Sequence, residues 1–137
     1  MFRESLVLRP SEPLTYAKLG QCELETGQIK AADATFESLR ALDPGSTAAS
    51  TGLGLIALRA RDSKVARAYF LETLAKEPNS VPTRQVLASI AEETDPAEAL
   101  RLCEEISHLA PETPGNDECI RRNRERIDGA SKNRGPR

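Results

Sequence analysis

A repeat interval of 34 residues runs through the chain and constrains its fold more than any other feature. The sequence holds three phenylalanines, Phe2, Phe36 and Phe70, and they stand at this interval. Two further residue types follow it: Pro10, Pro44, Pro78 and Leu19, Leu53, Leu87. A fixed period of about 20 to 50 residues is typical of architectures in which one small unit is stacked on the next.

Each period predicts two helices joined by a short turn. Apolar and small residues recur at three- and four-residue steps, which is helical spacing: Tyr16, Leu19, Gly20, Leu24, then Ala32, Phe36, Leu39. The turn between the two helices is ETGQIK in one copy and RARDSK in the next. The segments DPGS and EPNS end one helix and can cap the following one. A third copy follows, one residue shorter, and closes at Pro111.

These positions resemble the tetratricopeptide repeat family. Its motif is a leucine and a small residue on the first helix, an alanine and a large residue on the second, and a closing proline. The three copies are Leu19, Gly20, Ala32, Phe36, Pro44; Leu53, Gly54, Ala66, Phe70, Pro78; and Leu87, Ala88, Ala99, Cys103, Pro111. The resemblance implies an all-α, right-handed solenoid of antiparallel helix pairs. Small residues let the two helices of a pair approach closely, and phenylalanine fills the gap between neighbouring pairs.

Several positions depart from the family pattern. Its early tryptophan is replaced by Tyr16, Ser50 and Arg84, and its later tyrosine by Glu23, Ala57 and Ala91. Cys103 replaces the large residue of the third copy, which we therefore expect to be the least stable.

The register predicts the following organisation along the chain. Residues 1–12 form the second half of an incomplete repeat, 13–46 repeat 1, 47–80 repeat 2, 81–113 repeat 3, 114–128 a capping helix that Gly129 ends, and 129–137 a disordered basic tail. Ile120 and Ile127 give the capping helix a narrow apolar stripe. The leading half-repeat either caps the array or indicates a cut into a longer array, and the second alternative is preferred.

The three cysteines, Cys22, Cys103 and Cys119, are an odd number without CxxC spacing, so we expect neither a disulfide framework nor a zinc site. Reduced thiols are the simpler interpretation, with Cys22 and Cys103 in core phases of the repeat and Cys119 the most accessible.

No catalytic motif is present. His108 is the single histidine, and neither GxSxG, HExxH nor a phosphate-binding glycine loop accompanies it. Adjacent glutamates such as Glu104 and Glu105 do not face one another on a helix. We therefore expect no enzyme activity, no metal and no cofactor.

Charge is distributed unevenly although the net charge is only −2. Residues 120–137 hold seven basic side chains against Glu125 and Asp128. Residues 115–137 contain no aromatic side chain that could stack on bases, so nucleic-acid binding is disfavoured. No apolar run approaches the roughly 20 residues that span a bilayer, and the first residues lack signal-peptide features, so we expect no membrane partner and a cytoplasmic location.

Binding of a protein or peptide is the function that these patterns favour. In stacked helix pairs the first helices line a concave face. The side chains expected there are Leu14, Lys18, Gln21, Thr51, Leu55, Arg59, Gln85, Val86 and Ser89. Leu53, Gly54 and Ala57 are expected to point toward the second helix instead.

Family members that hold the acidic carboxyl terminus of heat-shock chaperones use a clamp of lysine, asparagine and arginine. The matching positions here are Ala17, Gln21, Gly52, Pro82 and Val86, so that ligand is disfavoured. Two alternatives to a free-standing interaction scaffold remain. The chain is the repeat domain of a larger enzyme or assembly factor that positions substrate, or it self-associates through its leading half-repeat.

Overall fold

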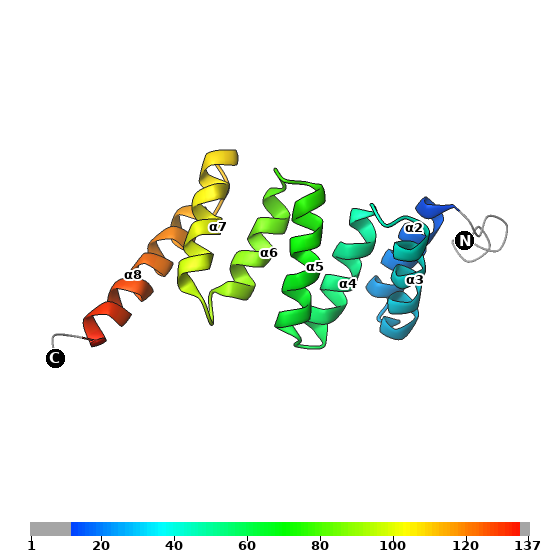
Figure 1. Cartoon of the computed structure of the whole chain (residues 1–137), viewed down its shortest axis with the longest axis horizontal. Coiled ribbons are helices and arrows are strands. Elements are labelled where there is room, and N and C mark those ends of the chain that lie inside the picture. The colour runs from blue at the N-terminus through cyan, green and yellow to red at the C-terminus, as the bar shows by residue number, and fades with distance from the viewer. Residues whose placement is uncertain (1–11, 135–137) are drawn as a thin grey trace. The chain divides into compact units, whose positions relative to one another are not determined.

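The computed structural model describes residues 12–134, and every regular element within them is an α-helix. Figure 1 shows them in chain order. They are α2 (Pro13–Glu25), α3 (Ile29–Leu42), α4 (Thr47–Arg59), α5 (Ser63–Lys76), α6 (Val81–Ala91), α7 (Pro96–Leu109) and α8 (Asn116–Arg134). The all-α prediction is confirmed. The predicted leading half-repeat, with Phe2 and Leu6, lies outside the described residues.

Helix starts follow the repeat. Ser46 and Ser80 occupy the same repeat position, and their hydroxyls accept from the backbone N–H of Ala49 and of Thr83, at 3.2 Å in both cases. The DPGS and EPNS segments therefore cap the helices that follow them, as predicted. The turns inside the first two pairs each contain a left-handed residue, which is Gly27 (φ 81°) in the first pair and Arg61 (φ 60°) in the second.

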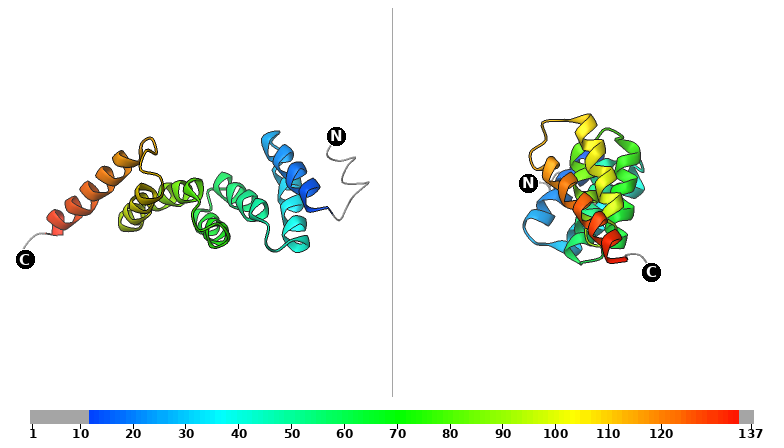
Figure 2. Two further views of the ribbon diagram at one scale, coloured as in Figure 1. Left: turned by 90° about the horizontal axis from the view of Figure 1, so that it is seen from above. Right: turned by 90° about the vertical axis from the view of Figure 1, so that its left-hand side faces the viewer.

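The chain divides into two compact units, which we describe separately: unit 1 extends to Glu77 and unit 2 begins at Pro78. In unit 1, α2 packs on α3, α3 on α4 and α4 on α5, and α2 also contacts α4. In unit 2, α7 packs on both α6 and α8. Figure 2 shows the same helices from two further sides. We call α2, α4 and α6 the first helices and α3, α5 and α7 the second helices.

Two phenylalanine rings form the centre of unit 1. Phe36 is buried with its ring between two glycines, where an added Cβ would lie 2.8 Å from the ring at Gly20 and 2.5 Å at Gly52. Phe70 lies in the same way against Gly54, at 2.7 Å. The glycines thus make room for the rings, as the repeat pattern predicts. Gly52 is a difference: the sequence placed it in the outward clamp position, whereas it is buried against the preceding repeat.

Polar contacts stand where the family has its large aromatic residues. In the first pair the hydroxyl of Thr35 donates to the buried carboxylate of Glu23 at 2.6 Å. In the second pair the hydroxyls of Ser50 and Thr73 are 2.6 Å apart. A buried polar group is tolerated when it is hydrogen-bonded, so these contacts replace aromatic packing.

Unit 2 has a smaller core. Leu87, Leu102 and Ile106 are at most 2% exposed, and no phenylalanine accompanies them. Cys103 stands in its place and is equally buried, at 1% exposed. The sequence was right that this position belongs to the core.

Helix α8 differs from its predicted extent. It begins at Asn116 and continues through Gly129 to Arg134, whereas the sequence predicted an end at Asp128 and a disordered segment beyond it. A glycine inside a helix costs only about 1 kcal/mol relative to alanine, so it stops a helix only when the backbone turns left-handed there. Gly129 has no such φ.

Candidate functional site

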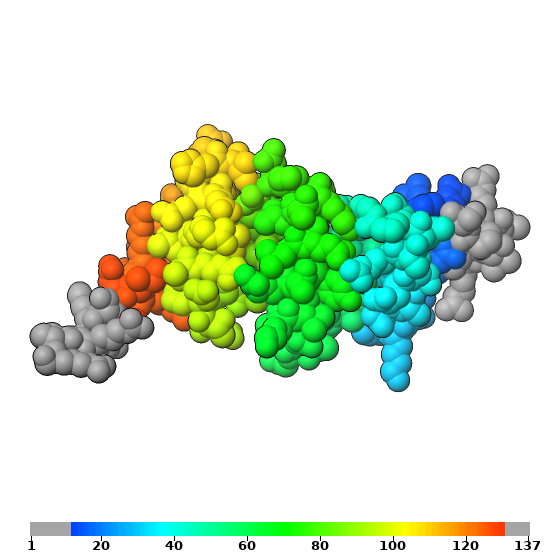
Figure 3. Space-filling view, viewed as in Figure 1, coloured from blue at the N-terminus to red at the C-terminus, as the bar shows by residue number. Residues whose placement is uncertain are grey.

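The first helices of unit 1 present the exposed side chains that the sequence predicted. On α2, Leu14 is 58% exposed, and Lys18 and Gln21 are exposed as well. On α4, Leu55 is 37% exposed, whereas Leu53 two residues earlier is buried. The second helices α3 and α5 form much of the unit 1 surface that faces the viewer in Figure 3.

Two of the predicted residues on α4 also take part in the fold. The guanidinium of Arg59 donates to the backbone oxygen of Leu24 at 3.1 Å, which satisfies a carbonyl at the end of α2. Thr51 is half-buried, and its hydroxyl lies 3.4 Å from that of Thr73 on α5. Leu55, the third predicted residue of α4, has an apolar side chain that is 37% exposed.

One repeat position runs through all three first helices with a changing side chain. It holds Gln21, Leu55 and Ser89, and each of them is exposed. The repeat position therefore carries a different side chain on each first helix.

In unit 2 a pocket of about 160 Å³ gathers part of the predicted surface. Gln85 and Ser89 of α6 line it, together with residues of α7, α8 and the loop before α8. The further lining residues are Ala88 of α6, Glu92 directly after it, and Cys103, Ile106, Pro114, Gly115, Asn116, Cys119 and Arg122. Val86 is half-buried and does not line the pocket.

A disulfide joins Cys103 of α7 to Cys119 of α8, with their Cα atoms 6.3 Å apart. The expectation of three reduced thiols is therefore wrong for this pair, and Cys22 alone remains free. The Cα separation lies inside the usual range for bonded cysteines. The sequence could not show the bond, because the register of α8 against α7 decides which residues meet.

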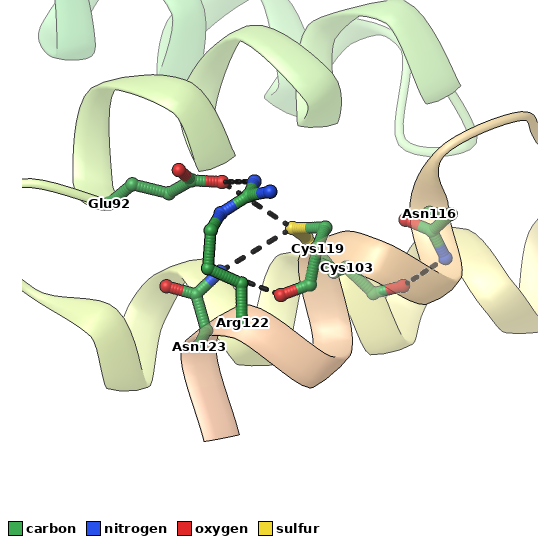
Figure 4. Close-up of a disulfide and its surroundings, with 6 residues drawn as sticks. All are labelled: Glu92, Cys103, Asn116, Cys119, Arg122 and Asn123. Atoms are coloured by element: carbon green, nitrogen blue, oxygen red, sulfur yellow. Dashed lines mark hydrogen bonds and ion pairs between the residues drawn. A yellow bond between two sulfur atoms is a disulfide. The ribbon is translucent and has the colours of Figure 1, made fainter. Parts of the chain in front are cut away.

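Polar groups surround the disulfide (Figure 4). The amide of Asn116 donates to the backbone oxygen of Cys103 at 2.8 Å, and that of Asn123 donates to the backbone oxygen of Cys119 at 2.8 Å. Arg122 pairs with Glu92, the residue directly after α6, at 2.5 Å. That hydrogen bond raises the pKa of the Arg122 guanidinium. Sequence reasoning identified none of these residues as part of a site.

A charged cluster connects α3 and α5 in unit 1. Arg40 donates to Glu72 at 2.6 Å and lies 5.5 Å from the ring centre of Tyr69. The hydrogen bond from Arg40 lowers the pKa of the Glu72 carboxyl, and burial raises the pKa of the Tyr69 hydroxyl. These contacts join the second helices α3 and α5.

Metal ligands, membrane-spanning helices and the histidine were considered as alternative features of the described residues. Between residues 12 and 130 no three histidine, cysteine or acidic side chains converge as metal ligands. None of the described helices is long and apolar enough to cross a membrane. His108 is exposed near the end of α7.

Comparison with known proteins identifies the repeats. Residues 17–46 match the model of the tetratricopeptide repeat. A 94-residue stretch is 31% identical to cellulose synthase operon protein C of Komagataeibacter xylinus, and it covers 65% of this chain but only 7% of that protein.

Solved structures show the same fold. The crystal structure of MamA has a TM-score of 0.82 at 17% identity and covers 93% of this chain and 75% of its own. The first tetratricopeptide domain of Spaghetti (RPAP3), solved with the HSP90 peptide SRMEEVD, has a TM-score of 0.76 at 14% identity and covers 85% of this chain and 94% of its own. The 34-residue period, the helix pairs and the residues matched lead to one conclusion: residues 17–46 match the tetratricopeptide repeat, and the chain has the fold of tetratricopeptide repeat proteins.

Proposed function

We propose that this chain is a non-catalytic protein-interaction scaffold that binds an extended peptide or a partner helix on the exposed face of its first helices. One observation carries the proposal. Leu14 and Leu55 are 58% and 37% exposed on first helices, whereas Leu19, Leu24 and Leu53 of the same helices are buried. An exposed leucine flanked by polar groups can anchor a partner, because contact with the partner removes its apolar surface from water.

The polar neighbours of these leucines support a peptide rather than a small molecule. Lys18 and Gln21 follow Leu14 on α2, and Gln21 is exposed beside Glu25, to which it donates at 3.2 Å. Such groups can bond to a peptide backbone and fix its direction. In unit 2, Gln85 and Ser89 of the third first helix contribute polar groups to the wall of the pocket.

A highly acidic peptide is not the ligand that this surface favours. Ala17, Gln21 and Gly52 stand at three of the clamp positions, and Gly52 is buried against Phe36. Lys18 is the single basic side chain among the exposed candidates of α2. The likeness to the HSP90-peptide complex therefore does not bring that peptide to this chain.

A panning experiment tests the proposal. Random peptides displayed on phage are selected on the immobilised full chain, and a selected peptide is then measured by fluorescence polarisation. Replacing Leu14 and Leu55 together by aspartate should weaken binding about tenfold or more, because hot-spot residues carry at least about 1 to 2 kcal/mol each.

Val65→Asp is the matched control. Val65 is 42% exposed but lies on the second helix α5, so this variant should bind the peptide like the wild type. Circular dichroism melts should show all three proteins folded. Equal loss of binding in the control and the double variant, or none in the double variant, would reject the first-helix face.

A second candidate follows from the match to a small part of a much longer relative. In this second candidate function, the chain is the repeat domain of a larger enzyme or assembly factor, whose chemistry lies outside this sequence. The coding frame decides: continuation into further repeats or a catalytic domain supports it, and stop codons directly on both sides exclude it.

The compartment is part of the proposal. The sequence predicts a cytoplasmic location, but disulfides persist mainly in oxidising compartments, so the Cys103–Cys119 bond favours one of those. Cell fractionation followed by immunoblotting distinguishes a cytoplasmic location from an oxidising compartment.

A further inference from the structure

We propose that the Cys103–Cys119 disulfide is a redox switch: it fastens α8 over the pocket of unit 2, and its two-electron reduction releases the helix and dismantles the pocket. This inference concerns how the pocket is built and does not depend on whether a peptide binds the first helices.

The first step is the position of the bond within the repeat. Phe36 and Phe70 fill this position in the first two repeats, each packed against a glycine of its own first helix. In repeat 3 the position holds Cys103, which is buried to 1% exposure. Where the other repeats place a permanent apolar contact, this one places a covalent contact that a reductant can break.

The second step is the weakness of the other contacts that hold α8. Its ion pairs to other helices, Arg122 with Glu92 and Arg124 with Glu104, join side chains that are 24% to 59% exposed, and exposed pairs contribute little. Arg126 also donates to the backbone oxygen of Glu92. Ile120 and Ile127 are only half-buried.

Asn123 adds to this weakness. Its side chain is fully buried, and its Oδ1 has no hydrogen-bond partner among the described residues. A buried acceptor without a donor favours exposure to water. Once the covalent bond is gone, this group therefore favours opening of the helix.

The third step is the composition of the pocket. Five of its eleven lining residues belong to α8 or to the loop before it, among them Asn116, Cys119 and Arg122. Gln85 and Ser89 of α6 face them from the other wall. Movement of α8 removes nearly half of the lining and uncovers Ile106 and Cys103.

The chemistry is thiol–disulfide exchange with a dithiol reductant. Cys119 is half-buried and Cys103 is buried, so the thiolate of the reductant attacks Cys119 Sγ. A mixed disulfide forms on Cys119, and Cys103 leaves as a thiolate and takes up a proton. The second thiol of the reductant then displaces the Cys119 thiolate, which is protonated, and the reductant ends as its own disulfide. A small disulfide such as oxidised glutathione reverses the reaction.

The experiment compares the oxidised and dithiothreitol-treated full chain by hydrogen exchange with mass spectrometry. An aliquot of the oxidised protein is first alkylated under denaturing, non-reducing conditions to count its free thiols. We expect one label, on Cys22. Reduction should raise the exchange of α8 amides roughly tenfold or more, and leave α2 to α5 unchanged, because unit 1 holds no part of the switch.

Two variants complete the test. Cys119→Ser should show fast α8 exchange with and without reductant, and Cys22→Ser should respond to reductant like the wild type. If Cys119→Ser does not fold, as unit 1 exchange reports, the reduced wild type supplies the same comparison. Three labels on the air-oxidised protein, or equal α8 exchange before and after reduction, would overturn the proposal.

Discussion

The contact between Phe36 and Gly52 shows how a single residue type sets the packing of unit 1. The ring lies between Gly20 on its own pair and Gly52 on the next, so it joins two repeats. A methyl group on either side has no space, because an added Cβ at Gly52 would lie 2.5 Å from the ring. The glycines are therefore required by the neighbour and not by their own backbone.

Gly52→Ala should destabilise the protein by about 1 to 2 kcal/mol. Overpacking costs about 1 to 3 kcal/mol, and the better helix propensity of alanine returns up to about 1 kcal/mol. Gly129→Ala is the matched control, since nothing lies within 4 Å of an added Cβ on α8, and it should be neutral or slightly stabilising. Urea melts measure both. A neutral Gly52→Ala would mean that the Phe36 ring can move aside.

At the scale of the helix, the N-termini of the second helices α3 and α5 differ in their capping. Asp62 accepts from the backbone N–H of Val65 at 3.2 Å and so caps α5. Gln28 stands at the same repeat position before α3, and its side chain makes no capping bond. Aspartate is among the best N-cap residues, whereas glutamine is too long to close back on the helix.

The two caps can be exchanged as a reciprocal test. Gln28→Asp should stabilise unit 1 by about 1 kcal/mol, and Asp62→Gln should destabilise it by about the same amount. The exposed hydrogen bond from Gln28 to Thr26 is lost in the first variant and contributes little. Thermal melts of both variants should shift in opposite directions. Shifts of the same sign would show that helix capping does not limit the stability of this unit.

Particular helices also show what the sequence could and could not predict. The period placed Phe36, Phe70 and the caps Ser46 and Ser80 correctly, because each depends on contacts inside one repeat or with the next. The burial of Gly52 was missed, because the same repeat position holds Lys18 and Val86 in the other copies, so the period did not mark it as a packing position.

The disulfide and the end of α8 were missed for a related reason. Helix α8 follows the third repeat without being a copy of it, so the period gave no register for placing Cys119 against Cys103. Its highly polar sequence gave no apolar pattern that marked Arg134 as the end. Where the period applies, the sequence is sufficient; beyond it, packing decides.

At the scale of the whole molecule, we propose different roles for the surfaces of the first and of the second helices. The second helices of unit 1 are joined by the Arg40–Glu72 pair, with side chains 42% and 30% exposed, which serves the fold. The first helices carry Leu14 and Leu55, which the fold leaves exposed. We therefore propose that the partner binds the first helices.

Nuclear magnetic resonance of the nitrogen-labelled full chain tests that assignment most directly. A peptide selected by panning is titrated into the oxidised protein, and the amide shifts are followed residue by residue. We predict that the largest changes fall on α2 and α4, around Leu14, Lys18 and Leu55. Changes centred on α3 and α5, around Arg40 and Val65, would contradict it.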